Sequence, residues 1–490
     1  MEAMTSQANV QPLDSTTLHG RRVIYSDETA VTEKNVIDIL SRALPIHAKN
    51  SAEIQFLYNY YKGVQPIIGK TKQYRDEINN KVIVNRANEI VSFKTGYLMG
   101  QPVQYIYRGG NDKTLSKYIE MLNDYVFQQD KAAKDKELAD WFHICGTAFR
   151  MIKDNSENEG SPFNIYTLNP INTFVVYSSA VGHRPLMGVN YVEKLDGNTV
   201  YAVYTENTYY ELFAPTGLSP IKEDITLRRE STKSYIPKGV PIIEYPANSA
   251  RLGAFEIVLT MLNAINTVTS NRIDGIEQFV DAILVLTGVD MSDEEIAKIK
   301  QDLGLTLPQG ADAKYLIQEL NQTQTQTLVD DMYSTVLTIC GMPNRNGGSS
   351  TSDTGAAVIM RDGWSAAEAR ALDTERMFDI SEKHFLRLAL EIMNTRRETT
   401  LRLENIDIRF TRRNYENIQA KVQSLTTMLS SDKIHPRLAF EYCGMFVDPE
   451  LAFRISEEYE TEKKQATKNE LVGLMNEETL KAKANITAEE

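Results

Sequence analysis

Few residues of this sequence have the types and spacing that chemistry requires, and the most suggestive segment is residues 63–71. Its two glycines, Lys70 and Thr71 suggest a loop that holds phosphate groups with backbone amides. Such a loop has four residues between its glycines, whereas this segment has five. Pro66 also removes an amide that would face the phosphate, and the segment follows a predicted helix rather than a strand. We therefore predict that it does not bind a nucleotide.

Histidines and cysteines do not form the clusters that bind metals. No two histidines lie three or four residues apart, and no Cys-x-x-Cys motif occurs. Cys145 follows His143 by two residues, but side chains two apart on a helix point to different faces. We therefore interpret Cys145 as a small core residue rather than a nucleophile, and we expect no metal and no cofactor. Three widely spaced cysteines also indicate a reducing compartment.

Acidic clusters are the remaining candidates for catalysis. Residues 293–295 begin a predicted helix, where carboxylates favour the helix dipole, and residues 457–460 fit a solvated helix face. Asp330 and Asp331 lie near an unusual loop, but no partner base is evident and no serine-hydrolase motif occurs. We therefore expect no catalytic residue. Metal-dependent DNA cleavage, abolished by changing both aspartates, would revive the hypothesis of a nuclease.

The composition indicates an ordinary buried core and an acidic protein. The 490 residues are 42% hydrophobic and 24% charged, with a formal net charge of −13. Because proteins that grip nucleic acid usually carry a basic surface, tight DNA binding is disfavoured. A weak, sliding contact is still allowed, since strong pairing with phosphates would act as a brake. No apolar run of 18 residues and no signal-peptide core occurs, so we expect no membrane segment.

The hydrophobic pattern predicts an α+β chain. Short apolar runs with a period of two, separated by turn residues, predict an antiparallel β region from residue 147 to about residue 247. Helices are predicted on both sides of it, with Pro45 separating the first two. The predicted helices are residues 33–44, 51–62, 81–99, 113–127, 131–144 and 250–286, and residues 103–107 form a predicted strand.

A small α/β module is predicted at residues 287–318. It contains a capped helix, residues 292–302, and strand-like segments at 305–307 and 314–317. Toward the C-terminus the pattern predicts a strand over residues 401–410, helices over residues 415–429, 435–442 and 448–463, and a charged, mobile end.

Residues 321–396 combine three unusual features. A Gln/Thr-rich run leads into a helical pattern that ends at Gly341; the alternation of residues 321–327 would also suit a strand, but we prefer a helix with an uncharged polar face. A breaker-rich loop, residues 342–353, follows. A second helical pattern then spans residues 354–396, or about 65 Å. Apolar or small residues recur along it at every seventh position, which favours packing against the β region of the same chain.

Several motifs, taken in order, resemble one known family. They are residues 60–67, 85–102 and 279–288, followed by the loop with its long helix. They resemble the portal proteins of tailed double-stranded-DNA bacteriophages, in the branch typical of long-tailed phages of Gram-positive hosts. The resemblance covers about residues 33–463, and its specificity lies in the order and spacing of the motifs.

The resemblance implies an elongated α+β subunit with named parts. After a flexible arm (1–30) come a wing (31–249, rejoined at 354–414), a first stem helix (250–286), a clip (287–318) and a second stem helix (319–341). A tunnel loop (342–353), crown helices (415–470) and a mobile tail (471–490) complete the chain. Portal proteins form a ring, usually of twelve subunits, at one capsid vertex of the virion.

The resemblance also implies partners. DNA is pumped through the ring by the terminase, whose large subunit would meet the clip, and later leaves through it. Head-completion or adaptor proteins, the major capsid protein and scaffolding proteins are the other expected partners, with assembly in the host cytoplasm and no membrane contact. The alternative is another virion structural protein, a head–tail adaptor or minor head protein, that lacks the channel.

Three sets of site residues follow from combining the resemblance with the residue pattern. The tunnel loop would present Asn344, Arg345, Asn346, Gly347, Gly348, Ser349 and Ser350 to DNA. Candidates to line the channel from the stem are Gln322, Gln324, Gln326 and Asp330. Clip candidates for contact with the terminase or an adaptor are Lys298, Lys300 and Lys314.

Overall fold

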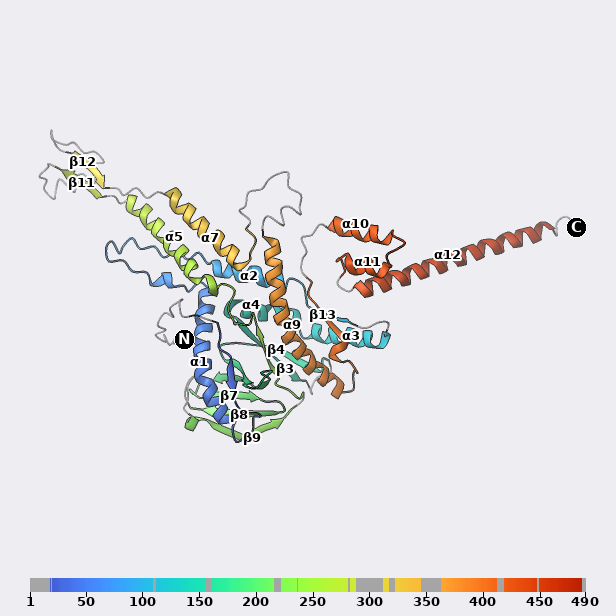
Figure 1. Cartoon of the computed structure of the whole chain (residues 1–490), viewed down its shortest axis with the longest axis horizontal. Helices are drawn as coiled ribbons and strands as arrows, with labels where there is room; N and C mark the ends of the chain where they lie inside the picture. Colours follow the sequence, from blue (N-terminus) through green and yellow to red (C-terminus); the bar gives the residue numbers. More distant parts are fainter. Residues whose placement is uncertain are drawn as a thin grey trace.

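The computed structural model describes residues 18–486 with gaps. The gaps are residues 19, 109–111, 156–159, 216–221, 236, 281–282, 288–311, 317–321, 345–362, 412–417 and 447–448. Only the backbone is described for residues 279–280, 283–286, 312–316, 418–420 and 470–486. Figure 1 shows an elongated molecule in which a helical hairpin leaves the central body on one side and a long C-terminal helix leaves it on the opposite side.

A six-stranded sheet in the order β1-β5-β6-β7-β8-β9 forms one part of the body. Its strands alternate buried and half-exposed side chains, as β7 shows with buried Thr199, Tyr201 and Val203. Helix α1 (Val36–Tyr61) covers the buried face, where Leu40 and Leu44 meet Val176 and Val189. The strands are β1 (Ile24–Ser26), β5 (Thr173–Ser178), β6 (Pro185–Glu193), β7 (Thr199–Tyr204), β8 (Thr208–Ala214) and β9 (Thr226–Ser234).

A three-stranded sheet in the order β10-β3-β4 forms the other part. Its strands are β3 (Thr147–Asp154), β4 (Phe163–Leu168) and β10 (Ile242–Pro246), packed with helices α3 (Lys113–Gln128), α4 (Lys131–Cys145) and α9 (Trp364–Thr395). Strand β2 (Gln104–Tyr107) pairs antiparallel with β13 (Ile406–Arg409), which joins the chain after α9 to the segment before α3. The packing of α9 on this β region confirms the expected partner of the long helix.

A buried ionic cluster fixes α9 in this core. Glu382 of α9 accepts from Arg150 Nη1 of β3 at 3.1 Å and from Lys131 Nζ of α4 at 2.8 Å. Asp135 pairs with the same two cations. Burial by itself would raise the pKa of Glu382, but Lys131 and Arg150 hold it below its ordinary value. Two carboxylates and two cations therefore balance inside the core.

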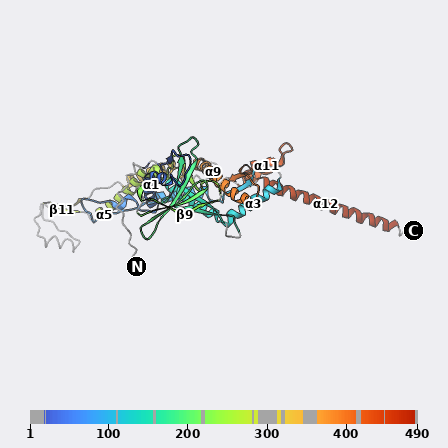
Figure 2. The same ribbon diagram turned by 90° about the horizontal axis from the view of Figure 1, so that it is seen from below.

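The projecting hairpin consists of α5 (Leu259–Val280) and α7 (Gln322–Cys340) (Figure 1). Beyond it, β11 (Ile283–Thr287) pairs antiparallel with β12 (Asp312–Leu316). At its base, α5 and α7 share a core with α1 and with α2 (Arg86–Leu98). Figure 2 shows β11 and α12 at opposite ends of the molecule in the second view as well.

Three C-terminal helices complete the described chain. They are α10 (Ile418–Leu429), α11 (Pro436–Tyr442) and α12 (Pro449–Ile486). Phe440 of α11 packs edge-on against Phe453 of α12, and His435 caps α11 by accepting from the amide of Arg437. Short 3₁₀ turns occur at Pro66–Gly69 (η2), Lys222–Asp224 (η3), Glu256–Val258 (η4) and Leu403–Asn405 (η5).

The predicted break at Pro45 is wrong, because α1 runs through it as one helix of 26 residues. Proline removes one backbone hydrogen bond and crowds the preceding turn. Leu40 and Leu44 before Pro45, and Ile54 and Leu57 after it, are all buried. Packing along both halves of the helix therefore outweighs the local cost.

Helix boundaries differ from the prediction elsewhere too, and the predicted helix 81–99 forms only as Arg86–Leu98. The predicted helix 250–286 forms only as Leu259–Val280, and Ile283–Thr287 is a strand because β12 is available as its partner. Helix α9 begins at Trp364 after Gly363, whose left-handed φ of 83° interrupts the predicted continuous helix, and residues 354–362 of that prediction lie outside the described residues. Helix α12 continues to Ile486, beyond the predicted end at residue 463, while the predicted mobility of the tail stays a prediction. The predicted helix 292–302 and strand 305–307 lie outside the described residues.

Candidate functional site

The α5–α7 hairpin contains α7, the first helix of the segment that the sequence singled out, and its base is tightly packed. Leu262 and Ile265 of α5 and Val336 and Leu337 of α7 are each 3% exposed or less. Tyr333 of α7 adds a polar link to α2, where its hydroxyl donates to Glu89 at 2.7 Å. The Arg86 guanidinium lies 3.8 Å from the centre of the Tyr333 ring. The hairpin therefore leaves the body on a rigid base.

Farther out, Arg272 of α5 joins the two helices. Its Nε donates to Gln322 Oε1 at 2.7 Å, and its Nη1 donates to Gln326. Gln326 in turn donates to Asp330 Oδ1 at 2.7 Å. Gln322, Gln326 and Asp330 are spaced by four residues and so lie on one face of α7. Three of the four residues predicted to line a channel thus belong to the polar network of Arg272.

Gln324, the fourth candidate, is exposed and lies about 200° around the helix from Gln322 or Gln326. Asn344 is half-buried and donates to Ser334 Oγ of α7 at 3.3 Å. The backbone of Lys314 lies on β12 opposite Val285. The other tunnel-loop and clip candidates lie outside the described residues: Arg345, Asn346, Gly347, Gly348, Ser349, Ser350, Lys298 and Lys300. The roles of all these residues remain predictions.

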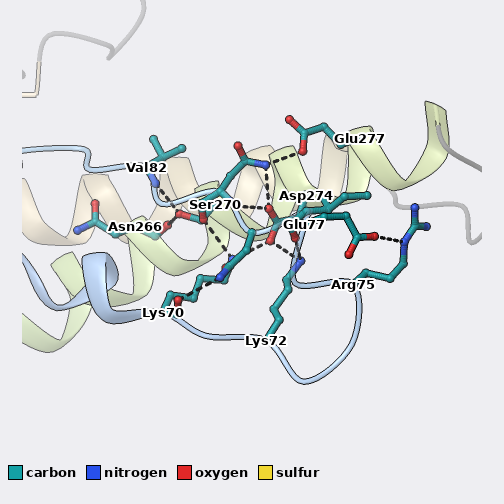
Figure 3. A network of polar contacts seen from close by, with 12 residues as sticks. Lys70, Lys72, Arg75, Glu77, Val82, Asn266, Ser270, Asp274 and Glu277 are labelled. Atoms are coloured by element: carbon teal, nitrogen blue, oxygen red, sulfur yellow. Dashed lines mark hydrogen bonds and ion pairs between the residues drawn. The ribbon is translucent and has the colours of Figure 1, made fainter.

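The strap, residues 70–84, is a part of the hairpin that sequence reasoning missed. It runs along α5, and buried polar residues of α5 accept hydrogen bonds from its backbone (Figure 3). Asn266, Ser270 and Asp274 are each 2% exposed or less. The sequence does contain a signal for this contact, because these polar residues recur at every fourth position of a helix that has few charges.

Asp274 is the most densely bonded of these residues. Its Oδ2 lies 2.7 Å from Lys70 Nζ and 2.6 Å from Lys72 Nζ. Its Oδ1 accepts from the backbone amide of Asn80 at 2.7 Å and from the Asn80 side chain at 2.9 Å. Burial by itself would raise the pKa of Asp274, but these four donors hold it far below its ordinary value. The carboxylate is therefore ionised across the physiological pH range.

A comparison with known families decides what kind of protein carries this hairpin. A family model described as phage portal protein, SPP1 Gp6-like, matches residues 40–470. The chain belongs to this portal family. The family is structural rather than catalytic, and the portal is a component of the phage virion.

No curated protein matches this portal chain. Two solved structures are similar to it at 9% sequence identity. One is the neck of an empty GTA particle, with a TM-score of 0.42 over 74% of this chain and 90% of that chain. The other is the virion of a native gene transfer agent (GTA) particle, with a TM-score of 0.43 over 81% and 94%.

The segment that looked like a phosphate loop has a structural role in the portal chain. Residues Pro66–Gly69 form a 3₁₀ turn, and Lys70 contacts Asp274 rather than an open cradle of amides. Gln65 lies buried between Tyr60 and Asn85, with its side-chain amide donating to both. The segment therefore connects α1 to the strap.

The other chemically suggestive residues lie in the core. Cys145 is fully buried, as predicted, and burial raises the pKa of its thiol to about 12. Burial likewise lowers the pKa of His143 to about 3 and that of His47 to about 4. None of these three groups is charged in the folded protein near neutral pH.

Two searches of the described residues were negative. In this part of the chain, no group of three or more His, Cys, Asp or Glu side chains is arranged to hold a metal ion. Among the described helices, none is both long enough and apolar enough to cross a bilayer.

Proposed function

We propose that this portal protein forms a ring-shaped channel at one capsid vertex, through which the terminase packages double-stranded DNA and through which the DNA is later ejected. The proposal rests on membership of the portal family together with one feature of this chain, the polar surface of α7, whose sequence contains no lysine or arginine. The resemblance suggests a ring of twelve subunits.

The exposed surface of α7 suits a conduit for a polyanion. Gln324, Thr327, Thr335 and Thr338 are exposed, and the sequence of α7 contains no lysine or arginine. Cations along the path would bind phosphates and release counterions, which strengthens the contact. Asp330 and Asp331 are exposed and would repel phosphates. This chemistry supports weak, non-specific contact with DNA.

The remaining partners follow from the family and the shape of the chain. The hairpin carries the β11–β12 pair at its far end (Figure 1), where β12 lies within the segment expected to form the clip and β11 leads into it. We propose that this end meets the terminase large subunit during packaging and the head-completion or adaptor proteins afterwards. Capsid and scaffolding proteins would contact the body of the ring.

Electron microscopy of the purified full-length protein tests the ring. We expect rings with a central hole and a single dominant symmetry. A monomer that persists across salt and protein concentrations, or rings without a hole, would contradict the proposal.

A charge-insertion experiment tests the channel surface. Thr327→Lys places one cation per subunit on the exposed face of α7, and we expect rings that assemble normally but package or eject DNA more slowly. Ser234→Lys, on the exposed edge strand β9, adds the same charge far from the hairpin and is the matched control. Equal packaging rates in both variants would show that this face of α7 does not meet DNA.

A further inference from the structure

The strap and α5 are joined by a regular row of three hydrogen bonds, which we call the ladder. The amides of Val84, Val82 and Asn80 donate to Asn266, Ser270 and Asp274 at 2.8, 3.0 and 2.7 Å. The donors advance by two residues while the acceptors advance by four, in opposite chain directions. Figure 3 shows Val82 and Ser270 in the middle of this row.

The distance between successive donors along the strap matches the distance between successive acceptors along α5. Four residues of an α-helix rise about 6.0 Å, and two residues of an extended chain span about 6.6 Å. An extended strap can therefore place every second amide on successive turns of α5. The acceptors are buried, so a displaced amide or carboxylate would have no water to replace its partner.

The ladder lies across α5 from the second helix of the hairpin. Arg272 is two residues from both Ser270 and Asp274, which places its side chain about 200° around the helix. On that side Arg272 holds α7 through Gln322 and Gln326. Helix α5 is thus fastened on one face to the strap and on the opposite face to α7.

The strap itself is closed into a compact loop. Lys72 Nζ donates to the carbonyl oxygen of Ile78 at 2.6 Å, and the Asn79 side chain donates to the carbonyl oxygen of Lys70 at 3.1 Å. Both ends of this loop reach Asp274, through Lys70 and Asn80. The strap therefore behaves as a preformed partner for α5 rather than as a loose strand.

We propose that Asn266, Ser270 and Asp274 are positioning residues that lock α5 in one axial register relative to the body. A slide of α5 along its axis would leave three amides and two lysines without these partners, because Leu262 and Gln278, one turn beyond the row on either side, offer no carboxylate. Through Arg272 the lock also sets the axial position of α7. This inference rests on the proposed function only for its consequence, the position of the hairpin surface along a DNA channel.

Hydrogen exchange of the full-length protein, read at single-residue resolution by fragmentation mass spectrometry, tests the lock directly. We expect alternating protection, with slow exchange at Asn80, Val82 and Val84 and faster exchange at Lys81 and Ile83. Uniform exchange across residues 80–84 would overturn the ladder. This readout needs no DNA and no ring, so it is independent of the proposed function.

Variants separate a register role from general stability. Ser270→Ala should speed exchange at Val82 by about tenfold, the change expected for one lost hydrogen bond, and Ser270→Thr, which keeps a hydroxyl acceptor, should restore protection. Asp274→Asn should keep the Asn80 amide protected but release Lys70 and Lys72. Thr267→Ala, at an exposed position of α5, is the matched control and should change none of these amides.

DNA retention then tests the consequence. Particles assembled with Ser270→Ala should form rings yet retain less DNA than those with Thr267→Ala or Ser270→Thr. Altered exchange with unchanged DNA retention would overturn the positioning role while leaving the ladder in place. Absence of any ring would instead count against the proposed function alone.

Discussion

Arg272 of α5 donates to Gln322 of α7 at 2.7 Å, across 50 residues of sequence that contain β11 and β12. The same guanidinium also reaches Gln326 one turn farther along α7. A planar fork that holds two amide oxygens fixes both the distance and the relative rotation of the helices. Through this contact Arg272 holds α5 to the outer end of α7, which begins at Gln322.

Replacing Arg272 should loosen the outer hairpin without unfolding the protein. We expect Arg272→Ala to cost about 1 kcal/mol, since the contact is partly exposed, and to speed exchange of the first turns of α7. Arg272→Lys should restore only part of the protection, because an ammonium cannot hold both glutamines as a fork. Full protection in Arg272→Ala would show that packing alone holds the helices together.

The buried ionic cluster predicts a large effect of one conservative change. Glu382→Gln removes a carboxylate while Arg150 and Lys131 remain buried, so we expect a loss of about 3–5 kcal/mol in the free energy of unfolding. Asp379→Asn on the same helix breaks only the surface pair with Lys383 and should cost less than about 0.5 kcal/mol. Urea unfolding of both variants measures the difference, and similar midpoints would contradict the prediction.

Two buried histidines predict a loss of stability in mild acid. The folded-state pKa values of about 4 for His47 and about 3 for His143 lie below the ordinary value of 6.5. The unfolded chain therefore takes up protons first, so this stability is complete above about pH 6.5 and falls as the pH drops toward 4. Each histidine should contribute a slope of about 1.4 kcal/mol per pH unit in that range.

Melting temperatures measured between pH 7.5 and 5 check this slope. His47→Gln should reduce the slope by about half, because it removes one of the two histidines that titrate. The protein should still fold, because the glutamine amide can donate to the carbonyl oxygen of Ile171, which the His47 ring nitrogen meets at 2.9 Å. An unchanged slope in this variant would assign the acid sensitivity to other groups. The low pKa of Asp274 means that the strap should stay attached throughout this range.

Two glycines with similar backbone angles should respond very differently to alanine. Gly146 joins α4 to β3 with a φ of 84°, and an added Cβ would overlap the carbonyl oxygen of Arg251. Gly146→Ala should therefore abolish soluble expression. Gly182 has a φ of 95° with open space around it, so Gly182→Ala should cost only about 1 kcal/mol of backbone strain. Comparable yields of both proteins would contradict the close approach at Gly146.

Deleting residues 347–350 should spare folding and ring assembly but impair DNA packaging or retention. The sequence of this segment, two glycines and two serines, offers no apolar side chain to a core. Soluble yield, ring images and packaged DNA measure the three properties separately. Loss of soluble protein would show instead that the segment has a structural role.

The sequence by itself determined most of the element types, residues 81–84 and 283–287 being exceptions, because local spacing controls which face of a helix or strand is apolar. The period of two between residues 147 and 247 predicted the β region, and the helical spacing of Leu328, Met332 and Ile339 predicted α7. The order of the motifs also led to the portal family. None of these inferences needs a contact between distant segments.

Only the tertiary structure decided where elements end and which polar groups meet. Pro45 stays inside α1 because residues on both sides of it pack on the body, and residues 283–287 pair as a strand because β12 lies beside them. The ladder joins residues 80–84 to α5 across about 190 residues, and Arg272 occupies two glutamines that sequence alone had assigned to a channel. Burial and hydrogen-bond pairing are properties of the folded chain, so a one-dimensional pattern identifies the polar residues but not their partners.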